Sequence, residues 1–185
     1  APGGMVFHVL NRGVGRQCLF HKAADYAAFE DIMIETLEKV PTRICGYCLM
    51  PNHWHMVLWP ERDGELAEFM QRLTVTHVTR WQRHYHRVGE GHVYQGRFKS
   101  FPVETDGYFY QVMRYVERNA LRANLVERAE EWQWSSLWRR ESGGLDQRRD
   151  RHQHPAVYTG CPPRLGIGGR RSPGSRDRRR RRGVC

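Results

Sequence analysis

The sequence predicts an α+β domain of the ferredoxin-like class, in which a split βαβ unit forms an antiparallel sheet with helices on one face. Two observations support this fold class. Apolar residues form four short strand-like runs, and they recur at helical spacing in three longer segments. These segments follow one another in the order β-α-β-β-α-β, and an added C-terminal helix completes the domain.

The first half of the chain supplies a strand, a helix and a hairpin. Met5–Leu10 is a short apolar run that ends in a loop at NRG. Apolar residues recur at helical spacing from about residue 22 to residue 39, and Pro41 ends that helix. The runs RICGYCLM (43–50) and HWHMVLW (53–59) flank the turn signal MPN, so we expect them to pair as a hairpin.

The second half supplies two further helices and a strand. A helix opens at the DG pair (63–64) and carries an apolar stripe as far as Trp81. HVYQGRFKSFPVE is predicted to be a loop and a fourth strand, and Pro102 places that strand at an edge or at its own end. Thr105–Asp106 can cap the third helix, GYFYQVMRYVER. WQWSSLW is predicted to form a final helical turn whose tryptophans pack on the domain.

Charge divides the chain into a neutral domain over residues 1–138 and a basic tail over residues 139–185. The domain carries 16 Lys or Arg and 16 Asp or Glu, whereas the tail carries 14 Arg against 4 acids. The tail is rich in Gly, Pro and Arg, a composition that predicts disorder. It is either a polybasic arm for nucleic acid or an incidental extension, and the lack of any repeat favours the second.

A basic band lies inside the neutral domain. Residues 72–122 carry nine Lys or Arg against four acids, and four histidines join them. A groove for a polyanion and a solvated helix face explain this band equally well.

Composition favours a cytoplasmic protein without a membrane span. No apolar run approaches the roughly 18 residues that a span needs, and the N-terminus lacks the pattern of a signal peptide. Five irregularly spaced cysteines argue against a disulfide framework and for a reducing compartment. Cys45 and Cys48 have the spacing of a metal pair, but an offset of three along a strand sends them to opposite faces. We therefore expect small, half-buried residues there.

Two histidines in the third predicted strand are the first candidates for chemistry. His53 and His55 share a face because side chains at i and i+2 of a strand point the same way. Trp54, Met56 and Leu58 then point to the other side and are predicted to form core under the helices. Two imidazoles on one face can hold a metal ion, although an isolated H-x-H motif is usually incidental.

The third predicted helix carries the second set of candidates. Tyr115 and Asn119 are four residues apart and share a polar face, which Tyr108, Gln111 and Arg122 extend. An Asn amide oxygen is a reasonable third metal ligand, and a tyrosine one turn earlier would lie beside whatever the metal activates. The alternative is that Tyr115 is a half-buried aromatic at a contact between helix and sheet.

Several blocks together resemble the HUH (histidine–hydrophobic–histidine) single-tyrosine transposases, most closely the REP-associated tyrosine transposases of bacteria. The resemblance covers about residues 5–138 and rests on FHVLNRG, YCLMPNHWHMVLWP, YQGRFKS, YFYQVMRYVERNALRANLV and WQWSS, in that order. It implies the split βαβ fold with an added C-terminal catalytic helix, and a place at the nucleoid. The chain departs from the family in its tail and in lacking a basic lead before the first strand.

The resemblance implies a reaction and a set of site residues. His53, His55 and Asn119 would hold a divalent ion, Mg²⁺ or Mn²⁺, and Tyr115 would be the nucleophile. The substrate would be single-stranded or hairpin DNA such as a REP palindrome. Cleavage would leave a 5′-phosphotyrosine and a free 3′-hydroxyl, and rejoining would reverse it, in a monomer or a homodimer. Phosphate contacts would come from the predicted DNA-binding residues Arg12, Arg97, Lys99, Arg114 and Arg122.

Three other readings of the same residues stay open. A metal-dependent hydrolase would use water as its nucleophile, and Tyr115 would only pack. A non-catalytic module for single-stranded nucleic acid would expose aromatic residues on its central strands, where this sequence has histidines. A decayed transposase copy would fold without being active.

Overall fold

A four-stranded antiparallel sheet with the strand order β2-β3-β1-β4 organises the domain. The structure, a computed structural model, describes residues 1–142. β1 (Val6–Arg12) and β3 (His53–Trp59) form the centre, and β2 (Arg43–Met50) and β4 (Lys99–Val103) form the edges. The elements follow the order β1-α1-β2-β3-α2-β4, so the predicted split βαβ fold is confirmed.

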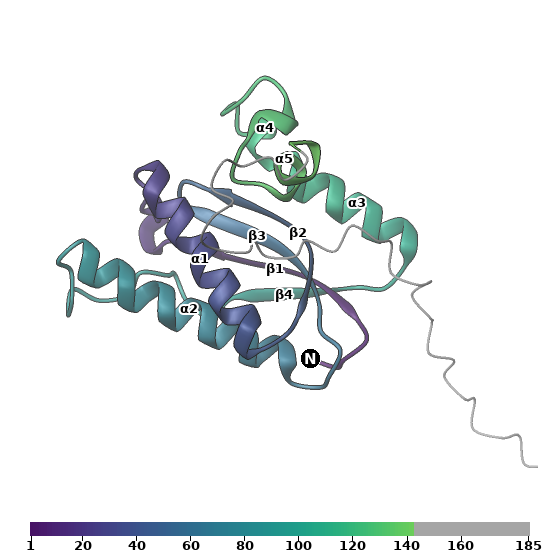
Figure 1. Ribbon diagram of the computed structural model, residues 1–185, viewed down its shortest axis with the longest axis horizontal. Coiled ribbons are helices and arrows are strands. Elements are labelled where there is room, and N and C mark those ends of the chain that lie inside the picture. The colour runs from purple at the N-terminus through teal and green to yellow at the C-terminus, as the bar shows by residue number, and fades with distance from the viewer. Residues whose placement is uncertain (143–185) are drawn as a thin grey trace, which may run out of the picture.

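Helices cover both faces of this sheet (Figure 1). α1 (Ala23–Lys39) and α2 (Glu65–His84) lie on one face, where they share a core with Trp54, Met56 and Leu58. α3 (Asp106–Glu117) lies on the other face and packs Phe109, Val112 and Val116 against Val57 and Trp59. β3 is therefore buried on both sides beyond His53, whereas His8, Leu10 and Arg12 of β1 are only partly buried on the face that α3 shares. Within residues 1–142, no helix is both long and apolar enough to cross a membrane.

Helix starts follow the local signals that the sequence offers. Gly64 has a φ of 80°, a conformation that glycine adopts without strain, and α2 begins at the next residue. Thr105 caps α3, because its Oγ1 accepts a hydrogen bond of 3.2 Å from the backbone N–H of Tyr108. The predicted start of α2 and the predicted cap of α3 are confirmed.

The first strand is longer than predicted. Asn11 and Arg12, expected in a loop, continue the ladder with β3, where Arg12 stands opposite His53. The pairing partner on β3 extends this strand, and such a partner leaves no trace in the local sequence. Arg12 is thereby fixed beside the histidine pair.

The prediction that Cys45 and Cys48 face opposite sides of the sheet is wrong. A bulge between Ile44 and Gly46 shifts the register of β2, and both cysteines pack into the core under α3. Both thiols are buried, and burial raises the pKa of each to about 12. They are core residues and are fully buried, not half-buried as predicted, and residues 1–142 offer them no third ligand of the His, Cys, Asp or Glu type.

The C-terminal segment crosses the edge of the sheet before its last helix. Trp132 and Trp134 pack on the domain as predicted, but they precede α5 (Ser136–Glu141) instead of lying within it. Trp132 Nε1 donates to the carbonyl of Leu49 at 2.8 Å, and the Trp134 ring stacks on Tyr26 at 4.9 Å between centroids. A 3-10 turn over Ala129–Glu131 and a second turn at residues 133–134 carry these tryptophans, and α5 starts only after them.

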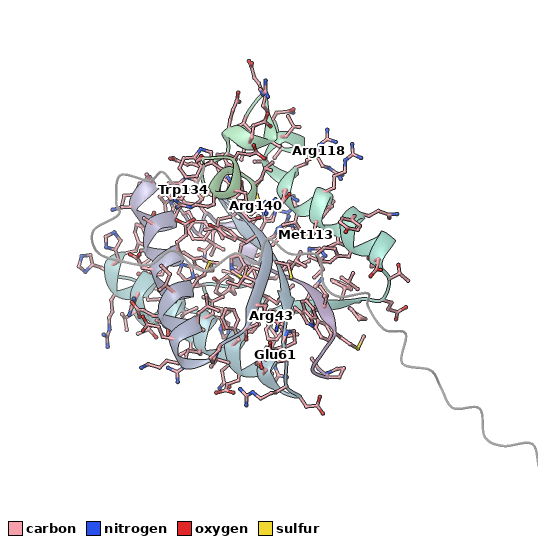
Figure 2. The ribbon with its side chains drawn as sticks, turned by 45° about the vertical axis from the view of Figure 1, so that its right-hand side comes forward. Arg43, Glu61, Met113, Arg118, Trp134 and Arg140 are labelled. Carbon is pink, nitrogen blue, oxygen red and sulfur yellow. The ribbon has the colours of Figure 1, made fainter. Side chains whose placement is uncertain are left out.

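Two ion pairs fix α5, the helix that carries Arg140 and directly follows Trp134 (Figure 2). Arg139 pairs with Glu30 of α1, and Arg140 pairs with Glu117 of α3. The boundary predicted after residue 138 therefore falls inside a packed helix. The rest of the basic tail, and with it the predicted disorder, lies outside the described residues.

We predict that Arg139 stabilises the domain much more than a surface arginine does. Glu30 is buried and accepts a hydrogen bond of 2.8 Å from the Tyr47 hydroxyl. Arg139→Ala removes the opposing charge from this carboxylate and should lower the free energy of unfolding by about 3 to 5 kcal/mol. Arg80→Ala, which breaks a half-exposed pair with Glu35, should cost less than about 1 kcal/mol. Equal losses in urea unfolding would contradict this assignment.

We also predict that acid destabilises the domain through His77. His77 Nδ1 lies 2.7 Å from the Tyr94 hydroxyl in the core, and burial lowers the pKa of His77 from 6.5 to about 3. Between these values the unfolded chain takes up a proton that the folded chain does not, so the free energy of unfolding falls as pH falls. His77→Asn keeps an acceptor but does not titrate. Between neutral pH and about pH 5 its free energy of unfolding should therefore fall less than that of the wild type. Parallel profiles in urea unfolding would contradict this.

Candidate active site

His53 and His55 lie on the face of β3 that α3 partly covers, as the alternation of the strand predicts. Their neighbour Trp54 belongs to the core under α1 and α2. The partner strand β1 brings two more residues to the site, because Leu10 stands opposite His55 and Arg12 stands opposite His53. The ladder between the two central strands thus sets the floor of the site.

Tyr115 belongs to α3, and its ring lies against the histidines of the two central strands. Its ring is perpendicular to that of His55, with 5.5 Å between centroids, and the side chain is 38% exposed. The ring therefore touches the histidines while its outer part meets solvent.

Asn119 reaches the site from a different helix than predicted. α3 ends at Glu117, Arg118 interrupts it with φ −92° and ψ 9°, and Asn119 is the first residue of α4 (Asn119–Arg122). Arg118 points away from the body of the domain in Figure 2. The expectation that one continuous helix carries Tyr115 and Asn119 is wrong, although both side chains still meet the histidines.

The three residues predicted to hold a metal ion lie together. His53 Nε2 is 3.3 Å from Asn119 Oδ1, and His53 Nδ1 is 2.7 Å from Asn52 Oδ1. A neutral imidazole carries one proton, and the shorter contact favours donation from Nδ1 to Asn52. The lone pairs of Nε2 and of the Asn119 oxygen then face each other. A cation between them would relieve this arrangement, so the residues fit a metal ion.

The protonation of the histidines suits the same role. Burial, together with the charges of His53, His8 and Arg12, lowers the pKa of His55 to about 3. The pKa of His53 is lowered by burial and by Arg12. Both imidazoles are therefore neutral at physiological pH, which is the form that binds metals.

An open groove of about 690 Å³ surrounds this cluster. Four of the predicted DNA-binding residues line it: Arg12, Arg97, Lys99 and Arg122. The guanidinium carbon of Arg122 is 5.1 Å from the centroid of the Tyr115 ring. The described residues that line the groove include no Asp or Glu. The groove is cationic, which suits a phosphate backbone.

Arg97 and Lys99 reach the groove by the predicted alternation. Both line it, whereas Phe98 between them packs against the core on the other face. Arg97 lies just before β4 rather than within it, because that strand begins at Lys99.

Arg114 does not reach the groove. It lines a separate surface hollow with Tyr110 and Arg118. Successive residues of an α-helix point about 100° apart, so the residue next to Tyr115 is directed elsewhere. The sequence expectation had grouped Arg114 with the other arginines by its place in the basic band alone.

Sequence reasoning missed His8. Its Nε2 lies 2.9 Å from His55 Nδ1, and the two rings stack with centroids 5.1 Å apart. His8 lies in the FHVLNRG block, but the resemblance assigned it no role. The alternation of β1 was the available structural signal, because it puts His8 on the same face as Leu10 and Arg12.

The metal-ligand set is incomplete without Asn119 and outside ligands. Within residues 1–142, no three His, Cys, Asp or Glu side chains are grouped so that they could hold a metal ion. An ion at His53 and His55 would therefore use the amide oxygen of Asn119. Water or phosphate oxygens would supply its remaining ligands.

Known proteins are similar to this chain in sequence and in structure. A family model described as "Transposase IS200 like" matches residues 3–119, a range that contains His53, His55, Tyr115 and Asn119. The solved structure of a REP-associated tyrosine transposase bound to a REP hairpin matches with a TM-score of 0.58 and 20% identity. The match covers 83% of this chain and 88% of that one, which supports the fold. No curated protein sequence matches the chain significantly.

Proposed function

The chain belongs to the family of IS200-like transposases, and from that premise we propose that it cleaves and rejoins single strands of DNA through Tyr115. One observation carries the proposal. The Tyr115 ring lies 5.5 Å from that of His55, in a cationic groove where His53 meets Asn119 at 3.3 Å. A nucleophile, a ligand set and phosphate-binding charges thus occupy one place.

Tyr115 would act as the nucleophile. Its hydroxyl oxygen forms a bond to the phosphorus of the scissile phosphate, and the bond from phosphorus to the 3′ oxygen breaks. The phenol gives up its proton and the departing 3′ oxygen gains one, so the products are a 5′-phosphotyrosine and a free 3′-hydroxyl. Rejoining is the reverse step with another 3′ end. The ester conserves the bond energy, so no external energy source is required.

The arginines and the lysine would bind and orient the strand. The guanidinium carbon of Arg122 lies 5.1 Å from the Tyr115 ring centroid, and a cation beside this ring would favour the negative charge that develops as the phenol loses its proton. Arg12 stands opposite His53 on the neighbouring strand, and Lys99 opens β4 at the groove. These cations neutralise phosphates and position the backbone, but they do not read its sequence.

His53, His55 and Asn119 would hold a divalent ion, Mg²⁺ or Mn²⁺. When bound, the ion supplies a Lewis acid that polarises a phosphate oxygen. Two neutral imidazoles with one amide oxygen leave room for water and phosphate oxygens, a set that suits these ions better than Zn²⁺. Because no carboxylate of residues 1–142 lines the groove, we expect the DNA phosphate to strengthen the binding of the ion.

Hairpin DNA is the proposed substrate class. The similar solved structure is of a REP-associated tyrosine transposase bound to a REP hairpin. The cationic groove of this chain supports a nucleic-acid partner of that kind, with the scissile phosphate in an unpaired stretch that can enter beside Tyr115.

A hydrolase that activates water is the second candidate, because the same ligand set would serve it. The two candidates differ in one respect. A water nucleophile leaves no bond between protein and DNA, whereas Tyr115 forms a covalent adduct that survives denaturation.

We predict that Tyr115→Phe abolishes cleavage and the covalent adduct. Phenylalanine keeps the ring contacts with His55 but lacks the oxygen, so folding and DNA binding should persist. The assay is incubation with labelled hairpin oligonucleotides and Mn²⁺, followed by denaturing electrophoresis. Tyr108→Phe is the matched control, because Tyr108 lies on the same helix but does not line the groove. Cleavage by Tyr115→Phe at the wild-type rate would exclude the tyrosine mechanism.

We predict that the His53→Ala, His55→Ala double variant loses Mn²⁺ binding in calorimetric titrations. Asn119→Ala should weaken binding less, since water can replace one amide oxygen. His92→Ala, at an exposed histidine outside this groove, should bind as the wild type does. For the wild type, affinity should rise when an oligonucleotide is present. Unchanged titrations in the double variant would remove the ion site from the mechanism.

A further inference from the structure

We propose that His8 is a positioning residue that fixes the orientation and the tautomer of His55. The effect of His8 on ion binding rests on the proposed function. The effect of His8 on the tautomer of His55 follows from the geometry of the two adjacent rings alone. His8 lies on β1, one strand away from His55, and does not line the groove itself.

His8 is confined on several sides. Its ring stacks on that of His55 with an interplanar angle of 19° and centroids 5.1 Å apart. The ring of Tyr115 meets it edge-on at 5.9 Å, and that of Phe101 lies at 6.2 Å. A single side chain thus touches both a proposed ligand and the proposed nucleophile.

The contact between the two histidines controls which nitrogen of His55 can bind an ion. His8 Nε2 and His55 Nδ1 are 2.9 Å apart, so a single proton lies between the two nitrogens. If His55 donates it, the Nε2 of His55 is bare and can bind a cation. If His8 donates it, the Nε2 of His55 carries a proton and cannot. A partner that accepts from Nδ1 therefore prepares the ligand.

Water does not readily replace His8 in this role. His55 is only 5% exposed, so its Nδ1 has little access to solvent. A side chain without an acceptor at residue 8 would leave the buried Nδ1–H unsatisfied. The proton would then favour Nε2, where the groove can solvate it, and the ring would lose its fixed orientation.

The experiment compares the full-length wild type with His8→Gln and His8→Leu. The Gln amide can place an oxygen near the position of the imidazole Nε2, whereas Leu fills the space without an acceptor. Nitrogen-15 chemical shifts of the His55 ring, recorded without metal, report the tautomer. We expect the proton on Nδ1 in the wild type and in the Gln variant, and on Nε2 in the Leu variant.

Calorimetric titration with Mn²⁺ provides the second readout. His8→Leu should bind about 10- to 100-fold more weakly than the wild type, and His8→Gln should recover most of the affinity. The control His92→Leu should leave both readouts unchanged. If circular dichroism shows that the Leu variant is unfolded, His8→Asn replaces it, because its shorter amide does not reach Nδ1.

Two results would overturn the inference: a wild-type His55 with its proton on Nε2, or His55 shifts that are the same in the wild type and in the variant without an acceptor. Failure of the proposed function gives a different result. If the wild type binds no Mn²⁺ at all, the ion site fails, while the ring nitrogen shifts still decide the role of His8.

Discussion

The antiparallel register between β1 and β3 is the constraint on which the site depends. It sets Arg12 opposite His53 and Leu10 opposite His55, and it leaves His8 one step further along the same face. A slip of one residue would turn the histidines of β3 into the core under α1 and α2. The register is held because that core fills the opposite face with Trp54 and its alternating neighbours. Packing on one side of the sheet thus secures chemistry on the other.

Much of the fold could be predicted because strong local signals mark its elements. The strands of the hairpin were predicted to the residue, since both are continuous apolar runs bounded by turn residues. The face shared by His53 and His55 follows from the period of a strand, because β3 pairs with β1 in a regular register without a bulge. The side of Cys45 could not be predicted, because the bulge beside Gly46 reverses it. A Cβ atom at Gly46 would lie 2.6 Å from the side chain of Met113, a residue far away in the sequence, so the local sequence does not reveal this constraint.

Residues of the site could be predicted only in two cases. Either a motif such as HWH follows the two-residue period of a strand, or the family resemblance assigns the residue a role. The roles of Tyr115 and Asn119 came from the resemblance and remain proposals. Their contacts with the histidine pair depend on how α3 and α4 pack on the sheet. Helical spacing alone predicted one continuous helix there, and that prediction was wrong. His8 escaped notice because its significance is a contact between two strands. Arg114 was misplaced because charge along the chain does not tell which way a helical side chain points.

The interval between Tyr115 and Asn119 makes this segment intolerant of changes in length. One residue added between Tyr115 and Asn119 would swing the amide by about 100° around the helix axis and away from His53, while the tyrosine stayed in place. The four-residue interval is therefore as strict as the two-residue interval in HWH. Insertions and deletions during divergence should accumulate elsewhere, for example in the exposed connection around residues 86–92, where three residues already adopt positive φ angles.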